Sequence, residues 1–95
     1  NVYLSPRERR QALSLSLGLN EARRRLAGGE RSGAKIAEAI RGVWRRFPMV
    51  KEDYVAVVDA TTLEPAARVR GRVLVAVAAR VGPARLIDNI EWEPR

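Results

Sequence analysis

The stretch from Gly71 to Val81, GRVLVAVAARV, constrains the fold more than any other part of the chain. It is apolar on both faces through most of its length, which is typical of a central strand covered on both sides. Gly82-Pro83 then predicts a turn. The residues from Ala84 to Trp92 are expected to return as an antiparallel strand. The sequence therefore predicts a hairpin whose first strand lies inside a sheet.

A helix is predicted ahead of the sheet by the sequence Ser5-Pro6-Arg7-Glu8. Ser5 can cap the first turn, Pro6 has no N–H to leave unpaired, and Glu8 can reach back to the cap. Gly28-Gly29 supplies a left-handed stop, so the helix is expected to end at about Leu26. Its buried stripe is spaced by three and four residues and comprises Ala12, Leu15, Leu19, Ala22 and Leu26.

Leu13 and Leu17 do not belong to that stripe, because at 100° per residue they point to the opposite side of the helix. Two explanations are open. Either the following loop or a chain end covers them, or they contact another domain or subunit.

A second helix is expected from Ser32, as its cap, to about Phe47, where Pro48 ends it. Composition then turns β-branched at Asp53–Val58, which predicts a strand. Thr61–Pro65 indicates a turn or a single helical turn. We expect one α+β domain over residues 1–95, in which two N-terminal helices pack on one face of a small three-stranded, mainly antiparallel sheet (ααβββ).

The chain contains no cysteine and no histidine. Disulfides, thiolate metal sites and Ser–His or Cys–His pairs are therefore excluded. No apolar run approaches the roughly 20 residues that a membrane helix needs. These features led us to expect no membrane partner and a cytoplasmic location.

The net charge of +7 lies in the first half of the chain, where residues 1–50 hold eleven basic and four acidic side chains. Such an excess indicates either a solvated helix surface or a polyanion partner. A small basic nucleic-acid-binding module is the alternative reading of the whole chain. It has little support, because Tyr54 and Trp92 are expected on different strands and form no base-stacking motif.

No catalytic constellation is evident. Gly28-Gly29 lacks the further glycines and the lysine of a phosphate loop. Asp88 interrupts an apolar row in the last strand and, if buried, requires a partner such as Arg85 or a cluster of backbone N–H groups. The chain begins at Asn1 without methionine, which we interpret as a processing site, a cloning boundary or the edge of a domain.

Several blocks of the sequence match the pantothenate synthetase (pantoate–β-alanine ligase) family, and together they span nearly the whole chain. The chain resembles that family at Asn1–Pro6 with Glu8-Arg9, at Asp53–Asp59, at Thr62–Pro65, at Leu74–Ala78 and at Arg85–Ile90. The Asn-x-Tyr-Leu-Ser start and the Arg-Leu-Ile-Asp-Asn-Ile block, at this separation, carry most of the specificity.

The resemblance implies the smaller C-terminal domain of such an enzyme, which acts as a lid over a Rossmann-like N-terminal catalytic domain absent from this chain. In the family, that larger domain binds ATP, pantoate and β-alanine. It also forms most of the contact between the two subunits of a homodimer. Magnesium-ATP adenylates pantoate with release of pyrophosphate. The amine of β-alanine then displaces AMP to give pantothenate.

The resemblance transfers no catalytic residue, metal ligand or cofactor to this chain, so we expect the isolated chain to be inactive. It implies that Asn1 and Tyr3 lie next to the nucleotide loop. Arg85, Asp88 and Asn89 are expected in structural or interdomain roles. A further hypothesis is that the basic first half adds positive field toward ATP and leaving pyrophosphate. Arg23–Arg25 facing away from the Asn1 edge would count against it.

Overall fold

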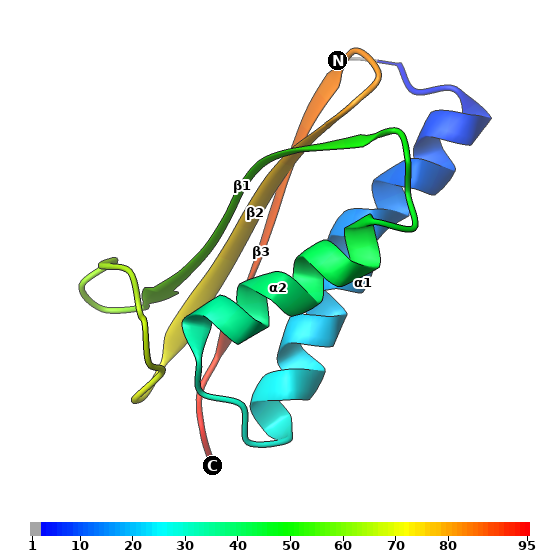
Figure 1. Ribbon diagram of the computed structural model, residues 1–95. Helices are drawn as coiled ribbons and strands as arrows, with labels where there is room; N and C mark the ends of the chain where they lie inside the picture. The colour runs from blue at the N-terminus through cyan, green and yellow to red at the C-terminus, as the bar shows by residue number, and fades with distance from the viewer. Residues whose placement is uncertain (1–2) are drawn as a thin grey trace.

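The computed structural model describes residues 3–95 and has the expected order of two helices followed by three strands (Figure 1). The elements are α1 (Pro6–Ala27), α2 (Gly33–Trp44), β1 (Val50–Asp59), β2 (Val73–Val81) and β3 (Ala84–Trp92). The α+β fold class and the ααβββ arrangement predicted from the sequence are confirmed.

β2 is the central strand of the sheet, as its composition predicted. The strand order is β1-β2-β3 and both pairings are antiparallel. Val77 of β2, for example, lies opposite Val55 on one side and Asp88 on the other. A bulge between Glu52 and Tyr54 shifts the register of β1. Gly82 makes the hairpin turn with a φ of 58°, in the left-handed region where glycine is favoured.

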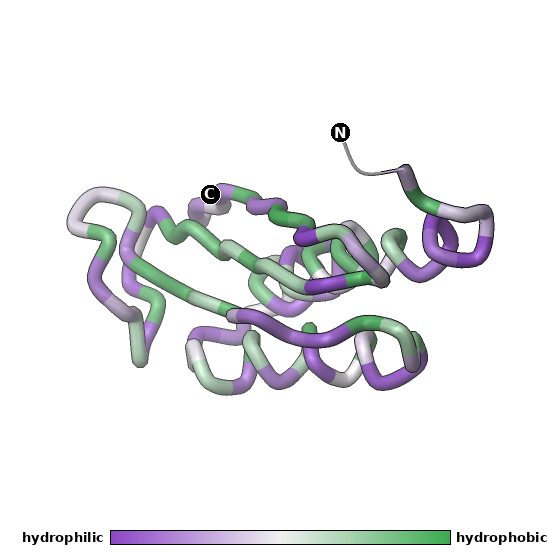
Figure 2. Tube along the Cα trace, turned by 90° about the horizontal axis from the view of Figure 1, so that it is seen from above, coloured by the Kyte–Doolittle hydropathy of each residue, from purple (hydrophilic) through white to green (hydrophobic). Residues whose placement is uncertain are grey.

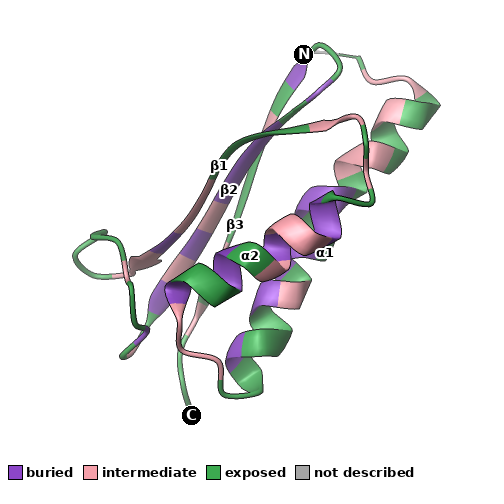
Figure 3. Ribbon diagram, in the orientation of Figure 1, coloured by how far each residue is buried: buried purple, intermediate pink, exposed green. Residues whose placement is uncertain are grey.

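Both helices lie on the same side of the sheet (Figure 2). The residues of β2 that point toward them are buried, including Val73, Val75, Val77 and Val81 (Figure 3). Within residues 3–95 no helix covers the other side, which we call the open face. The expectation that β2 is covered on both sides was therefore wrong for the described part of the chain. On the open face β2 carries Leu74, Ala76, Ala78 and Arg80. Ala78 is fully buried, Leu74 and Ala76 are half-buried, and Arg80 is exposed.

The start of α1 follows the predicted cap. The Glu8 N–H donates to Ser5 Oγ at 3.1 Å, and the Ser5 N–H donates to Glu8 Oε1 at 2.8 Å. This reciprocal pair satisfies two N–H groups that the first turn would otherwise leave without partners. At the other end Gly29 adopts a φ of 104°, so the left-handed stop is confirmed.

α2 ends at Trp44, three residues before the predicted end at Phe47. The N–H groups of Arg46 and Phe47 donate to the carbonyls of Val43 and Trp44, three residues back, which tightens the chain out of the α-helix before Pro48. Trp44, the last residue of α2, is buried in the core.

Candidate functional site

The first described residues, the start of α1 and the β2–β3 turn lie at one end of the molecule (Figure 1). A Cβ added to Gly82 would meet Glu8 Oε2 at 1.9 Å, so the capping carboxylate packs directly on the turn. Tyr3 is 82% exposed beside this end. Asn1, predicted with Tyr3 to be adjacent to the nucleotide, lies outside the described residues. The role of both residues stays a prediction.

Arg85 of β3 forms an ion pair that crosses the open face. Its Nε donates to Asp53 Oδ2 at 2.6 Å, although β2 lies between the two strands. This hydrogen bond raises the pKa of the Arg85 guanidinium above its usual range. The guanidinium carbon also lies 6.0 Å from the centroid of the Tyr54 ring. The side chain of Arg85 thus ties the two edge strands together above the central one.

Asp88 is not the buried carboxylate that the apolar row suggested, because it is exposed. The only hydrogen bond of its side chain within residues 3–95 is accepted by Oδ1 from the N–H of Asn89, at 2.8 Å. Arg85 cannot pair with it, since residues three apart on a strand point to opposite faces. Asn89 is exposed on the open face, opposite Ala76. A structural or interdomain role for Asp88 and Asn89 therefore depends on a neighbour outside the described chain.

Leu13 and Leu17 are 55% and 44% exposed, on the side of α1 that faces away from the sheet. Within residues 3–95 the loop after α1 does not cover them, so that part of the first explanation is wrong. Their contact with another domain or subunit stays a prediction.

Arg23–Arg25 lie in the last turns of α1, at the end far from Tyr3 (Figure 1). A helix of 22 residues is about 33 Å long. Arg24 Nη2 and Arg25 Nε also donate to Glu21 Oε2, at 2.7 and 2.8 Å. This placement of Arg23–Arg25 counts against the hypothesis that the basic first half adds positive field toward ATP.

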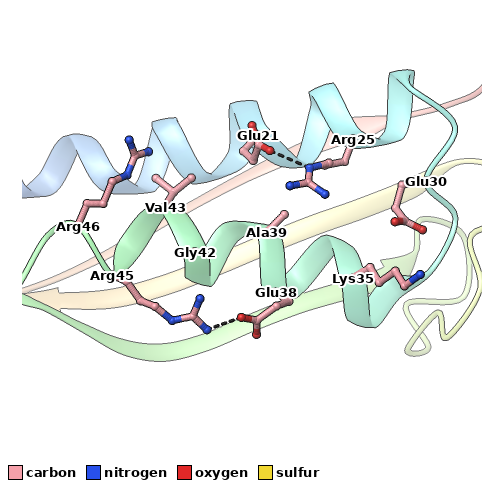
Figure 4. A pocket seen from close by; sticks show the side chains of 10 residues that line it. All are labelled: Glu21, Arg25, Glu30, Lys35, Glu38, Ala39, Gly42, Val43, Arg45 and Arg46. Carbon is pink, nitrogen blue, oxygen red and sulfur yellow. Dashed lines mark hydrogen bonds and ion pairs between the residues drawn. The ribbon is translucent and has the colours of Figure 1, made fainter.

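A groove between α1 and α2 is lined by charged side chains of both signs (Figure 4). Its carboxylates are all occupied: Glu21 accepts from Arg25, Glu38 accepts from Arg45, and Glu30 accepts from backbone N–H groups. The hydrogen bonds from Arg24 and Arg25 lower the pKa of Glu21 to about 2. A carboxylate with a pKa this low is ionised near neutral pH, so Glu21 holds no proton to donate there and is a weak base. Within the described residues, the carboxylates of the groove therefore compensate the charge of neighbouring arginines or accept from backbone N–H groups.

The described residues also lack the donors that a bound cation requires. No three His, Cys, Asp or Glu side chains within residues 3–95 come together to hold a metal ion. The resemblance implies magnesium for the complete enzyme and no metal ligand in this chain, and that expectation stays a prediction. Over the same residues, no helix is long and apolar enough to cross a membrane.

Two residues of the open face were not identified from the sequence as candidate site residues. Tyr54 and Ile87 are 40% and 67% exposed, and both lie opposite Ala78. The signal was present in the alternation of β3, where Ile87 falls on the opposite face from Leu86 and Ile90. Recognising that Tyr54 and Ile87 lie side by side also required the strand register, which places both of them opposite Ala78.

Comparison with known proteins agrees with the blocks that carry the resemblance. The family model described as pantoate-beta-alanine ligase matches residues 1–91. The pantothenate synthetase of Nitratidesulfovibrio vulgaris is 50% identical over 91 residues, which make up 95% of this chain and 32% of that protein. The pantothenate synthetase of Thermotoga neapolitana is 53% identical over 89 residues, or 94% of this chain and 32% of that protein.

A solved structure gives the same result. The crystal structure of pantothenate synthetase from Thermus thermophilus superimposes with a TM-score of 0.89 at 37% identity, covering 99% of this chain and 34% of that one. The chain therefore spans about a third of the length of the relatives it matches. Because the family model covers residues 1–91, the chain belongs to the pantoate-beta-alanine ligase family.

Proposed function

We propose that this chain is the C-terminal lid domain of a pantothenate synthetase, and that the complete enzyme joins pantoate to β-alanine with ATP and magnesium. The observation that carries the proposal is the match of almost the whole chain to one third of such enzymes, in sequence and in fold. The Rossmann-like domain, ATP, magnesium, pantoate, β-alanine and the homodimer contact all belong, in this proposal, to the part of the enzyme outside these residues. The complete enzyme is proposed to be cytoplasmic.

The proposed reaction has two steps. A carboxylate oxygen of pantoate attacks the α-phosphorus of ATP, forming pantoyl-adenylate and releasing pyrophosphate. The amine of β-alanine then attacks the acyl carbon, and AMP leaves. Water competes with the amine for the adenylate, so a domain that closes over it protects the intermediate without touching the reacting atoms.

The residues of this chain suit a covering role better than a catalytic one. Its described carboxylates are exposed or paired with arginine and backbone N–H groups, and it contains no histidine or cysteine. What it offers instead is a rigid two-layer body with exposed apolar residues, including Leu13 and Leu17. The isolated chain is accordingly expected to be inactive.

The alternative of a nucleic-acid-binding module gains nothing from the structure. Five arginines, at positions 24, 25, 41, 45 and 85, are each bonded to a carboxylate of the chain. Their charge is therefore compensated in place, which reduces what is left for a polyanion. A purely structural interaction domain that keeps only the fold is the remaining alternative.

Pantothenate formation from pantoate, β-alanine and ATP tests the proposal. The complete polypeptide that carries residues 1–95 should form pantothenate, AMP and pyrophosphate in equal amounts. The same polypeptide without residues 1–95 should hydrolyse more of its adenylate, giving pantoate and AMP with less pantothenate. A complete polypeptide that forms no pantothenate would contradict the proposal and favour the structural alternative.

A further inference from the structure

β3 is an edge strand, and its outer side pairs with no other strand within residues 3–95. It pairs with β2 over nine residues in a regular register. The other edge of the sheet is different, because β1 contains the bulge between Glu52 and Tyr54, and the N–H of Ala66 donates to the Val57 carbonyl there. Bulges and covering segments keep an edge strand from pairing with a strand of another molecule. Within the described chain, β3 has neither protection.

The backbone groups on this outer side follow from the β2–β3 turn. Gly82-Pro83 is a two-residue turn, so the residues that flank it form a hydrogen-bonded pair. Pairs of that kind alternate along a hairpin with pairs whose N–H and C=O groups point away from each other. The N–H of Asn89 agrees, because it donates to Asp88 Oδ1 at 2.8 Å and not to β2. The residues of β3 that direct their backbone groups outward, which we call the free edge, are Arg85, Ile87, Asn89 and Glu91.

A second copy of β3 fits the free edge when it runs antiparallel and is centred on Asp88. Asp88 is the middle residue of Ala84–Trp92, so the centred register pairs the two strands over their full length. In this register Arg85 lies opposite Glu91 of the second copy, and opposite charges in directly opposed positions stabilise a sheet. Of the Arg85 nitrogens only Nε is bonded to Asp53, and Glu91 forms no ion pair within residues 3–95. Both side chains are therefore available for the contact.

The centred register also matches the apolar side chains. Leu86, on the helix side of the sheet, lies opposite Ile90 of the second copy, and both are already half-buried. A shift of two residues in either direction shortens the paired length and separates Arg85 from Glu91. The strand is thus self-complementary in one register.

Asp88 opposes this pairing. It lies opposite Val77 on the helix side of β3, where it interrupts the apolar row. In the centred register it would face Asp88 of the second copy, in a pair without mutual hydrogen bonds and with Cα atoms about 4.5 Å apart. Like charges in such positions are destabilising. Its carboxylate also occupies the N–H of Asn89, a donor that pairing with a second copy requires.

We propose that Asp88 guards the free edge of β3, and that without its carboxylate two copies of this chain join through that edge into one continuous sheet. An inward-pointing charge on an edge strand is a known protection against such pairing. The inference does not depend on the proposed function. It gives a reason for a carboxylate that is exposed and bonded only to the N–H of the next residue.

Sedimentation equilibrium of the 95-residue chain and its variants tests the inference. Asp88→Val should dimerise with a dissociation constant about tenfold or more below that of the parent chain. Asp88→Asn keeps the shape and removes the charge, and should strengthen association in the same direction. Glu64→Val adds the same apolar side chain at an exposed position in the β1–β2 connection and should leave association unchanged. If neither Asp88 variant associates more strongly than the parent chain, the inference is wrong.

Further substitutions in the Asp88→Val chain locate the contact. Ile87→Pro removes an N–H of the free edge without breaking a bond to β2, so it should return the chain to a monomer. Glu91→Arg places like charges opposite each other and should weaken the dimer by about tenfold. Adding Arg85→Glu to that variant should restore the dimer. A dimer that survives both Ile87→Pro and Glu91→Arg lies elsewhere on the chain and overturns the inference.

Amide hydrogen exchange gives a readout that a contact elsewhere would not change. The N–H groups of Ile87 and Glu91 should exchange freely in the parent chain and about tenfold or more slowly in the Asp88→Val dimer. The N–H of Ile90, which points to β2, is the control and should be protected in both. Protection of Ile87 and Glu91 in the parent chain would mean that the free edge pairs with Asp88 in place, which also overturns the inference.

Discussion

The indole Nε1 of Trp44 donates a hydrogen bond to the carbonyl oxygen of Ser14 at 2.9 Å, inside the contact between α2 and α1. Both residues are buried, so the bond is formed away from water and holds the two helices in one relative position. The hydroxyl of Ser14 lies beside it, is also buried, and has no hydrogen-bond partner within the described residues.

Ser14→Ala should therefore raise the stability of the chain. The substitution removes a buried hydroxyl without a partner, leaves the carbonyl that Trp44 binds, and improves helix propensity. We expect the free energy of unfolding to rise by about 1 kcal/mol. Trp44→Phe is the opposing variant, and should lower it by about 1–3 kcal/mol, because the indole N–H is lost along with part of the packing. Urea titration followed by circular dichroism measures both, and a destabilised Ser14→Ala chain would contradict the account.

Two glycines of α2 should respond to alanine in opposite directions. A Cβ at Gly33 would lie 2.0 Å from the carbonyl oxygen of Ala66, and the Gly33 N–H is bonded to the Ala67 carbonyl at 3.0 Å. The backbone cannot easily retreat, so Gly33→Ala should cost about 3 kcal/mol. At Gly42 the nearest atom would be Arg45 Nη1 at 3.8 Å.

Gly42→Ala should therefore stabilise the chain by about 1 kcal/mol, because only helix propensity changes. The two variants share one helix and one chemical change, which makes each the control of the other. Thermal unfolding measures the difference. Similar melting temperatures for the two variants would contradict the close contact between Gly33 and the Ala66 carbonyl oxygen.

The sequence predicted the order of the elements because each carries local signals. Ser5, Pro6 and Glu8 determine the start of α1, and Gly82 determines the hairpin turn. The boundaries of α2 and β1 were less accurate, since the tight turns after Trp44 depend on packing of Trp44 and Phe47 that no local pattern encodes.

The candidate surfaces depended on contacts between distant residues. The exposure of Leu13 and Leu17 followed from helical periodicity alone. The row of Tyr54 and Ile87 on the open face did not, because it needs the register that places Tyr54 opposite Ala78 after a bulge. Asp88 was misjudged for a related reason: its strand is at the edge of the sheet, where an inward position can still reach solvent.

Arg31 and Trp92 should contribute to stability as a pair. The guanidinium carbon of Arg31 lies 4.8 Å from the Trp92 ring centroid, and Nη1 donates to the carbonyls of Leu26 and Glu30 at 2.8 and 2.9 Å. This cation–π contact connects the end of α1 to the end of β3. A double-mutant cycle with Arg31→Met and Trp92→Leu should give a coupling energy of about 0.5–1 kcal/mol. If the two substitutions change the free energy of unfolding additively, the contact between Arg31 and Trp92 does not contribute to stability.

The stability of the chain should not change between about pH 6 and 8 and should fall in acid. The chain contains no histidine, so no side chain with an ordinary pKa in that interval titrates there. The behaviour in acid depends on carboxyl groups. Hydrogen bonds from Arg24 and Arg25 lower the pKa of Glu21 from 4.5 to about 2. Backbone N–H groups of Thr62 and Thr61 likewise lower the pKa of Asp59.

A carboxyl group with a lowered pKa in the folded state stabilises that state fully above its unfolded pKa, and the contribution is lost as the pH falls through the folded pKa. The free energy of unfolding should thus decline from about pH 4.5 downward, toward the pKa of about 2 at Glu21. Glu21→Gln should flatten this decline, whereas Glu93→Gln, at an exposed position after β3, should leave it unchanged. Urea titrations from pH 2 to 8 measure the profile. If the profile for Glu21→Gln coincides with that of the parent chain, the ion pairs of Glu21 do not contribute to stability. The entropy lost in ordering exposed side chains would then offset their electrostatic energy.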